Sequence, residues 1–373
     1  MALDIGVLGY RFMGKAHSNA MARLPMFFPD APEINREVLV GRDEEALAEA
    51  AERLGFARTT TDPSEAIESV DVFYNLGPNF VHPEYSIEAL EAGVPVFCEK
   101  PLAPTLEEAE SMTEAYREAG VPAGCAFNYR FVPAIRYAKN LIESGELGEV
   151  YHVRGRYLQD WLVDPDAAWS WRNDAELAGS GALGDLGAHT IDLARFLVGD
   201  VAGEISQVSG QLRTFTDERP VEGGDEPREV TVDDAYLATA EFDGGAVGSF
   251  EASRNATGHK NDHTIEIEGS KGSLKFSLER LNELEYLREG SRGFETILVT
   301  DEDDPYIDHW WPPGHVIGWE HTFVHENYEF LSAVESGGEF EPSFEDGLAT
   351  QRVLAAIEES DVSGERVSLD LET

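Results

Sequence analysis

The stretch Asp4-Ile-Gly-Val-Leu-Gly-Tyr-Arg-Phe-Met-Gly14 predicts a short apolar strand, a glycine-rich turn and the start of a helix. Gly9 permits the tight turn, Gly14 permits close packing of the helix, and a helix N-terminus favours a pyrophosphate. Arg11 stands where the phosphate-binding fingerprint has its middle glycine, so its guanidinium is a candidate phosphate contact. An ordinary turn of some other α/β protein is the alternative interpretation.

The first 126 residues continue this opening as an alternation of strands and helices. Gly93 and Gly120 each follow a predicted helix where a left-handed cap is expected, and Thr105 with Glu108 forms a capping-box pattern. Strands spaced by helices predict a doubly wound parallel sheet with ligands at the carboxyl ends of its strands. The expected strands are 4–8, 37–40, 70–75, 94–98 and 121–126. The turn at 9–14 is expected to lead into a helix that runs through Ala22, and the further expected helices are 44–54, 83–91 and 106–118.

The pattern changes after about residue 127. A helix over 132–144 leads into several strands joined by short turns, which is typical of hairpins in a mainly antiparallel sheet. These strands are expected at 148–157, 206–214, 231–242, 246–253, 263–268 and 273–276, with loops at 217–229 and 301–304 and closing helices at 319–336 and 344–359. We therefore expect two domains, a Rossmann domain over residues 1–126 and an α+β domain over residues 127–373.

The charge balance is strongly acidic, with 72 Asp and Glu residues against 28 Lys and Arg residues and a net charge of −44. The acids are spread over patterned elements such as 43–52 and 107–114, which indicates a solvated acidic shell around a folded core. Screening relieves the repulsion within such a shell, so a high-salt cytoplasm is the expected location. Binding to nucleic acid or to an anionic membrane is disfavoured.

Three further observations limit the class of protein. No apolar run approaches the ~20 residues that span a bilayer. The first strand begins directly after Met1, which leaves no room for a secretion signal. Cys98 and Cys125 both lie in apolar, strand-like surroundings, where buried reduced thiols are favoured over a disulfide.

Two segments carry the candidate chemistry. Glu99-Lys100-Pro101 follows an apolar run, and residues 181–192, Gly-Ala-Leu-Gly-Asp-Leu-Gly-Ala-His-Thr-Ile-Asp, place Asp185 and His189 on one face of a helix. His189 titrates near neutrality and suits a general base, Lys100 can stabilise negative charge on oxygen, and Asp185 can orient the substrate or the imidazole. The alternative is structural: Lys100 pairs with Glu99, and the other two residues satisfy the helix.

Together these segments resemble the glucose–fructose oxidoreductase/inositol dehydrogenase/MocA (Gfo/Idh/MocA) family. The resemblance runs through Gly9–Gly14 with Lys15-Ala-His17, then Gly77-Pro-Asn-Phe-Val-His82, Glu99-Lys100-Pro101 and 181–192, and covers nearly the whole chain. It implies a Rossmann domain, an open-faced antiparallel sheet domain that binds substrate and joins a homodimer or homotetramer, and NAD(P)-dependent oxidation or reduction of a sugar, inositol or other polyol. From the acidic composition, we expect this protein to be a halophile-type member of the family.

The resemblance also assigns residues position by position. Lys100, Asp185 and His189 match the family's catalytic residues. The positions on the cofactor side are Gly9, Phe12, Met13, Pro78, His82 and Glu99. Arg11 in place of the middle glycine leaves the pyrophosphate contact open.

The choice of cofactor depends on the end of the second strand. NAD enzymes usually place an acid there for the ribose 2′-hydroxyl, whereas NADP enzymes place a cation near the 2′-phosphate. On the family pattern the acid would fall at Gly41, so Gly41 followed by Arg42 favours NADP. Asp43 keeps NAD open, and a surface cation is the alternative role for Arg42.

Aromatic residues suggest where a sugar would bind. Trp171, Arg172 and His315 are candidate substrate contacts, because indole faces pack on sugar rings while Arg and His bind hydroxyls. Core packing or a subunit interface explains such residues equally well. His321 and His325 are four residues apart, but no third ligand stands at a diagnostic spacing, so we expect no metal.

The sequence thus predicts a sugar or polyol dehydrogenase, and two other classes stay open. One is a catalytically silent dinucleotide-binding sensor, which would not need both Lys100 and His189. The other is a metal-dependent sugar lyase, whose activity would survive removal of the cofactor but not chelation.

Overall fold

The computed structural model describes residues 2–224 and 226–369, which form two compact units. One comprises Met1–Phe131 with Gly318–Leu348, and the other comprises Val132–Ile317 with Ala349–Thr373. The expected boundary at residue 126 stays a prediction, and the structure groups the segment 318–348 with the N-terminal unit.

The N-terminal unit contains a six-stranded sheet whose neighbouring strands all pair in parallel. The strand order β3-β2-β1-β4-β5-β6 is that of a Rossmann sheet, which confirms the predicted doubly wound fold. Helices α1 and α9 contact each other, as do α4 and α5. The strands are β1 (Leu3–Leu8), β2 (Ile34–Val40), β3 (Arg58–Thr60), β4 (Val72–Asn75), β5 (Val96–Cys98) and β6 (Ala123–Cys125), and the helices are α1 (Phe12–Phe27), α2 (Glu44–Leu54), α3 (Pro63–Ile67), α4 (His82–Glu91), α5 (Leu106–Ala119) and α9 (Glu320–Ser336).

Local sequence explains where these helices begin and end. The Asp43 side chain accepts the Ala46 N–H at 3.1 Å and so caps α2, which ends at Gly55 in the left-handed conformation. The capping box predicted at Thr105 and Glu108 is present at the start of α5. Strand β3 and helix α3 are three and five residues long, too short for the hydrophobic period to indicate them.

The two cysteines lie on the last two strands of this sheet, β5 and β6. Cys98 on β5 and Cys125 on β6 are register partners, and both are buried thiols outside any disulfide. Burial raises the pKa of the Cys98 thiol, so the thiolate is disfavoured. Their role is therefore that of small apolar residues in the core.

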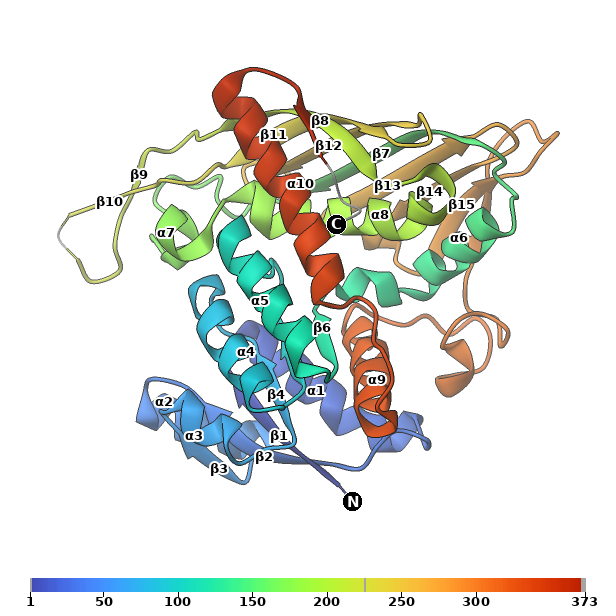
Figure 1. The fold of residues 1–373 in the computed structure, drawn as a ribbon. Coiled ribbons are helices and arrows are strands. Elements are labelled where there is room, and N and C mark those ends of the chain that lie inside the picture. Colours follow the sequence, from blue (N-terminus) through green and yellow to red (C-terminus); the bar gives the residue numbers. More distant parts are fainter. Residues whose placement is uncertain (1, 225, 370–373) are drawn as a thin grey trace. The chain divides into compact units, whose positions relative to one another are not determined.

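The second unit is built on a nine-stranded sheet of order β16-β15-β14-β13-β7-β12-β11-β8-β17 (Figure 1). All neighbours pair antiparallel except β7 and β12, so the sheet is mainly antiparallel as predicted. Helix α6 (Pro133–Glu143) contacts α8 (Ala188–Ala202), and α8 contacts β7. The strands are β7 (Val150–Leu158), β8 (Ile205–Arg213), β11 (Ala235–Phe242), β12 (Val247–Ser253), β13 (Asp262–Gly269), β14 (Ser273–Ser277), β15 (Glu283–Leu287), β16 (Glu295–Leu298) and β17 (Val367–Ser368), and α10 (Phe344–Ser363) precedes the last.

One predicted loop is more ordered than expected. Within 217–229, β9 (Glu218–Arg219) and β10 (Arg228–Glu229) form an antiparallel ribbon. The Arg219 side chain is fully buried and donates to the carbonyls of Leu162 and Asp164 at 2.9 Å each. Nothing in the sequence indicated this buried arginine, because the many acidic residues of the segment are typical of a solvated loop.

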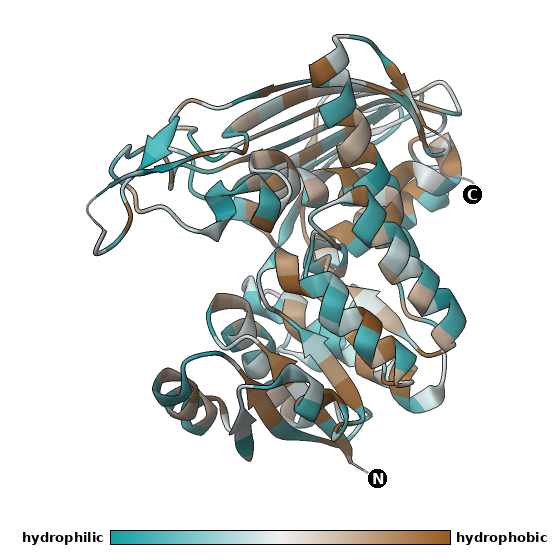
Figure 2. Ribbon diagram, turned by 60° about the vertical axis from the view of Figure 1, so that its left-hand side comes forward, coloured by the Kyte–Doolittle hydropathy of each residue, from teal (hydrophilic) through white to brown (hydrophobic). Residues whose placement is uncertain are grey.

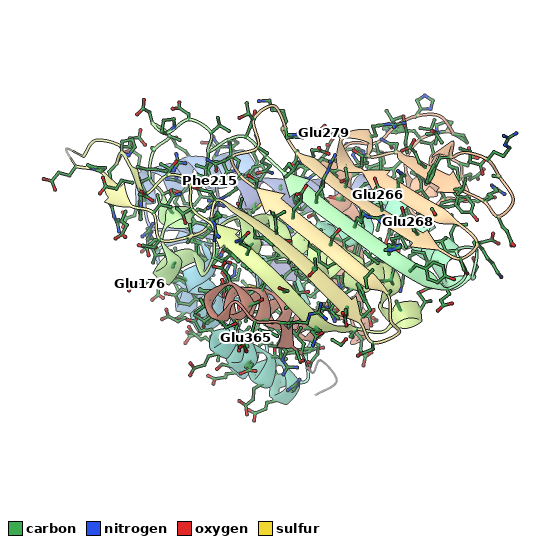
Figure 3. All side chains as sticks on the ribbon, turned by 90° about the horizontal axis from the view of Figure 1, so that it is seen from above. Glu176, Phe215, Glu266, Glu268, Glu279 and Glu365 are labelled. Atoms are coloured by element: carbon green, nitrogen blue, oxygen red, sulfur yellow. The ribbon has the colours of Figure 1, made fainter. Side chains whose placement is uncertain are left out.

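One face of the nine-stranded sheet is polar and carries a shallow groove of about 700 Å³. Charged side chains pair laterally across neighbouring strands, for example Arg154 with Glu268 at 2.8 Å and Lys275 with Glu266 at 3.3 Å. Figure 3 shows this face, with Glu266 and Glu268 labelled on β13. Hydrophobic residues stand out in the strands of the N-terminal sheet, whereas the helices have mixed colours (Figure 2). Among the described residues, no helix combines the length and the apolar character that crossing a membrane requires.

Candidate functional site

The turn between β1 and α1 has the geometry of an anion site. The Gly9 N–H donates to the Val40 carbonyl at 3.0 Å, and Arg11, which is exposed, stands at the N-cap of α1. The Arg11 side chain makes no capping hydrogen bond to this helix start. The N-terminus of α1 and the Arg11 guanidinium can therefore both face a pyrophosphate.

An exposed aromatic pair lies directly after this turn. Phe12 is 67% exposed and stacks on Trp319, with 5.6 Å between ring centroids and 11° between ring planes. Met13 beside it is half-buried. The sequence reasoning missed Trp319, because nothing in the local pattern joins a residue just before α9 to the start of α1.

The end of β2 brings Tyr10 against Gly41. A Cβ atom at Gly41 would lie 2.3 Å from Cε1 of the Tyr10 ring, so any larger residue at position 41 would force the Tyr10 ring to move. Arg42 is exposed, and the carboxylate of Asp43 is engaged as the α2 N-cap. The Tyr10 ring thus fills the place from which an acidic side chain at position 41 would project.

Glu99 and Lys100 follow β5 and are held by buried side chains of two helices. His17 on α1 is fully buried, and its Nε2 lies 3.3 Å from Oε1 of Glu99. The Asn327 amide nitrogen on α9 lies 3.0 Å from His17 Nδ1, which makes Nδ1 the acceptor and leaves Nε2–H to donate to Glu99. The other Glu99 oxygen accepts the backbone N–H of Lys100 at 3.2 Å, so this network fixes the backbone from which the lysine projects.

His82 supports the same segment from within the fold. It is fully buried, and its ring nitrogens lie 3.1 Å from the carbonyl oxygens of Gly77 and Pro101. Burial lowers the pKa of His82, while the two carbonyls act in the opposite direction. The ring therefore ties the loop containing Pro78, which is half-buried, to the peptide after Lys100.

Asp185 and His189 lie on an irregular helix in the second unit. Leu183–Gly187 forms a π-helical turn, closed by a hydrogen bond from the Ala188 N–H to the Leu183 carbonyl, and α8 continues from it. Turns of this kind occur frequently at functional sites. Asp185 is half-buried, and His189 is 8% exposed.

The surroundings of His189 are aromatic. Its ring centroid lies 6.1 Å from that of Tyr157 on β7, which in turn stacks on His263 of β13 at 4.5 Å. Burial lowers the pKa of His263 to about 3, so this histidine is neutral, and its Nε2 lies 3.2 Å from the Thr190 hydroxyl. The sequence reasoning missed Tyr157 and His263, although their inward positions on alternating strands were a usable signal.

The candidate substrate residues occupy separate loops of the second unit. Trp171 and Arg172 form a cation–π pair with 4.4 Å from the guanidinium carbon to the ring centroid. His315 is exposed, and its Nδ1 lies 2.7 Å from the Pro312 carbonyl. No contact recorded for the described residues joins His315 to the Trp171 turn.

His321 and His325 are engaged separately in the N-terminal unit. His321 Nδ1 accepts the Gly318 N–H at 3.1 Å, and His325 Nδ1 lies 2.9 Å from the Phe131 carbonyl. Across residues 2–224 and 226–369, no group of three or more His, Cys, Asp or Glu side chains is arranged to hold a metal ion.

Comparison with known proteins accounts for both units. Residues 3–127 match the oxidoreductase family with an NAD-binding Rossmann fold, and residues 135–275 match the GFO/IDH/MocA C-terminal domain. Levoglucosan dehydrogenase of Pseudarthrobacter phenanthrenivorans is 42% identical over 378 residues, covering 96% of each chain.

Solved structures agree over the same length. An oxidoreductase domain protein from Kribbella flavida has a TM-score of 0.95 at 47% identity, covering 99% of this chain and all of that one. A levoglucosan dehydrogenase in complex with NADH and levoglucosan has a TM-score of 0.94 at 42% identity, covering 99% of each chain. The chain therefore belongs to the Gfo/Idh/MocA family of oxidoreductases.

Proposed function

We propose that this protein is an NAD(P)-dependent dehydrogenase that oxidises a secondary hydroxyl of an anhydrosugar or related sugar. The observation that carries the proposal is its whole-chain similarity to levoglucosan dehydrogenase, a structure of which contains both NADH and levoglucosan. The N-terminus of α1, which the Arg11 side chain does not cap, and the Arg11 guanidinium fit a dinucleotide pyrophosphate. Phe12, Met13, Pro78 and Glu99 are the further cofactor-side residues of the proposal, and His82 contributes by holding the Gly77 loop.

The chemistry follows from three side chains. A bound nicotinamide supplies the hydride acceptor. His189 takes the proton of the reacting hydroxyl, and the Lys100 ammonium stabilises the negative charge that develops on the oxygen. Asp185 orients the substrate hydroxyls or the imidazole. Trp171, Arg172 and His315 are the proposed contacts to the rest of the sugar ring.

Cofactor choice is proposed to be broad. The NADH complex of the relative supports NAD. In favour of NADP, position 41 carries no acid that would repel a 2′-phosphate, and the exposed Arg42 offers a cation for it. We infer that the chain uses both cofactors and that Arg42 admits NADP.

The proposal extends to the protein's setting. The polar face of the nine-stranded sheet is the proposed interface of a homodimer or homotetramer. The charge of −44 supports a halophile-type protein of a high-salt cytoplasm.

The test is a screen of NAD and NADP reduction against levoglucosan, aldoses and inositols in molar KCl. We expect turnover on an anhydrosugar, at a rate that the addition of EDTA does not lower.

The variants Lys100→Met and His189→Ala should each lower kcat at least about 100-fold while cofactor binding persists, because each removes transition-state stabilisation. Lys260→Met is the control, since Lys260 is an exposed lysine paired with Asp160. Near wild-type kcat in either variant, or cofactor-free turnover stopped by EDTA, contradicts the proposal.

A further inference from the structure

Asp233 binds three consecutive backbone N–H groups. It lies in the loop before β11 with 6% of its surface exposed. Its carboxylate accepts the N–H groups of Gly181 at 2.6 Å and Leu183 at 2.9 Å, and its own carbonyl accepts that of Ala182 at 3.0 Å. One residue thus holds the whole backbone of 181–183.

These donors form the first turn of the segment that carries Asp185 and His189. The first N–H groups of a helix have no partner within it, so their acceptor decides where the helix begins. A Cβ atom at Gly181 would lie 1.7 Å from the Asp233 carbonyl oxygen, so this approach requires glycine. The opening glycine of the 181–192 stretch is therefore explained by its contact with Asp233.

Arg254 connects the same residue to the Trp171 turn. Its side chain is 1% exposed, and it donates through Nη2 to the Asp233 carbonyl at 2.9 Å and through Nη1 to the Arg172 carbonyl at 3.3 Å. Burial raises the pKa of Asp233, and the nearby Arg254 guanidinium opposes that shift. The acceptor for the 181–183 turn is thus itself held in place.

We propose that Asp233 is a positioning residue for the dehydrogenase reaction, fixing the backbone of 181–183 and through it the placement of Asp185 and His189. The inference rests on the proposed function. A displacement of about 1 Å in a reacting group can lower a rate about 100-fold, so a partial loss of this contact is visible in kcat. The competing role for Asp233 is stability alone.

Asp234 provides a matched control. It is fully buried, and its Oδ2 accepts the N–H groups of Phe215 at 2.7 Å and Thr216 at 3.2 Å, in a segment without proposed catalytic residues. Asp233→Asn and Asp234→Asn each replace one buried acceptor oxygen by an amide. Both Asp233 oxygens accept an N–H group, whereas only Oδ2 of Asp234 does. We expect a fall in kcat of about tenfold or more only in Asp233→Asn, with the KM for NAD within twofold of wild type.

Asp233→Glu serves as the second variant, because it keeps the carboxylate but lengthens the side chain by one methylene. Its kcat should also fall severalfold, at unchanged KM for NAD. Wild-type kcat in the folded Asp233 variants, or an equal fall in Asp234→Asn, overturns the inference. A wild-type protein that oxidises no sugar with either cofactor overturns the proposed function instead, so the two failures are distinguishable.

Discussion

At the scale of single residues, a substitution at Arg42 tests the proposal that the protein uses NADP. On the proposed role of Arg42, Arg42→Ala removes a charge-assisted hydrogen bond to the 2′-phosphate, and such a bond is worth about 1.5–3 kcal/mol. NADP use should therefore weaken about tenfold or more, while NAD use changes little. Initial-rate titrations of both cofactors measure this, with Arg53→Ala on the exposed surface of α2 as control. An equal loss for both cofactors would show that Arg42 serves the adenine or the fold.

The neighbouring Gly41 shows why a second substitution should help to shift preference toward NAD. Gly41→Asp alone pushes its Cβ into the Tyr10 ring. We therefore expect Gly41→Asp to favour NAD more strongly when Tyr10 is also replaced by a smaller residue than when it is introduced alone.

The sequence singled out individual residues as candidates only where they stand in a motif of consecutive residues. Gly9, Lys100 and His189 stand in local motifs. The contact of His17 with Asn327 joins positions 310 residues apart, and no periodicity connects them. Asp233 was missed for the same reason, because its partners lie 50 and 52 residues upstream.

At the scale of elements, the pattern predicted a helix over 181–192 but not its π-helical turn. An i,i+4 spacing is compatible with both geometries. Whether the turn is α-helical or π-helical depends on the backbone position of its first residues. A tertiary contact with Asp233 fixes that position. Strands β15, β16 and β17 were missed at the edges of the second sheet, where short length and polar faces weaken the alternation.

Helix α10 carries a titrating carboxyl next to the same segment. Burial raises the pKa of Glu358 to about 7, the Asp233 carboxylate adds to the shift, and a hydrogen bond with Ser180 opposes it. Because the folded state holds this proton more tightly than the unfolded state, the contribution of Glu358 to stability is fully present below about pH 4.5 and is lost as pH rises through about 7.

Glu358→Gln should remove this pH dependence. We expect its Tm to match that of wild type at pH 5 and to exceed it by about 2 °C or more at pH 8. Thermal melts at both pH values check this, with the exposed neighbour in Glu359→Gln as control. A parallel pH dependence in wild type and Glu358→Gln would contradict the assignment.

At the scale of the whole molecule, the acidic shell predicts a dependence on salt. Many acids of α2 and α5 are exposed, among them Glu44, Glu49, Glu107 and Glu114. Raising KCl from 0.01 M to 0.1 M shortens the Debye length from about 30 Å to about 10 Å. We expect Tm to rise already over this interval and to continue rising toward molar KCl. A Tm that is constant up to 0.1 M would count against repulsion within the shell.

The fold class was predictable at this scale because alternating strands and helices allow few topologies. The doubly wound order and the mainly antiparallel second sheet both followed from that pattern. The placement of 318–348 did not, since a helical period gives no information on which sheet its helix joins.

That placement has a consequence for synthesis of the chain. Helix α9 supplies Asn327 to His17 and follows Trp319, which stacks on Phe12, yet it emerges from the ribosome almost 200 residues after β6. Chains fold from the N-terminus as they are made, at about 5–20 residues per second. The nascent Rossmann sheet therefore waits at least about ten seconds for its last helix, with the apolar side of α1 open to chaperones during that time.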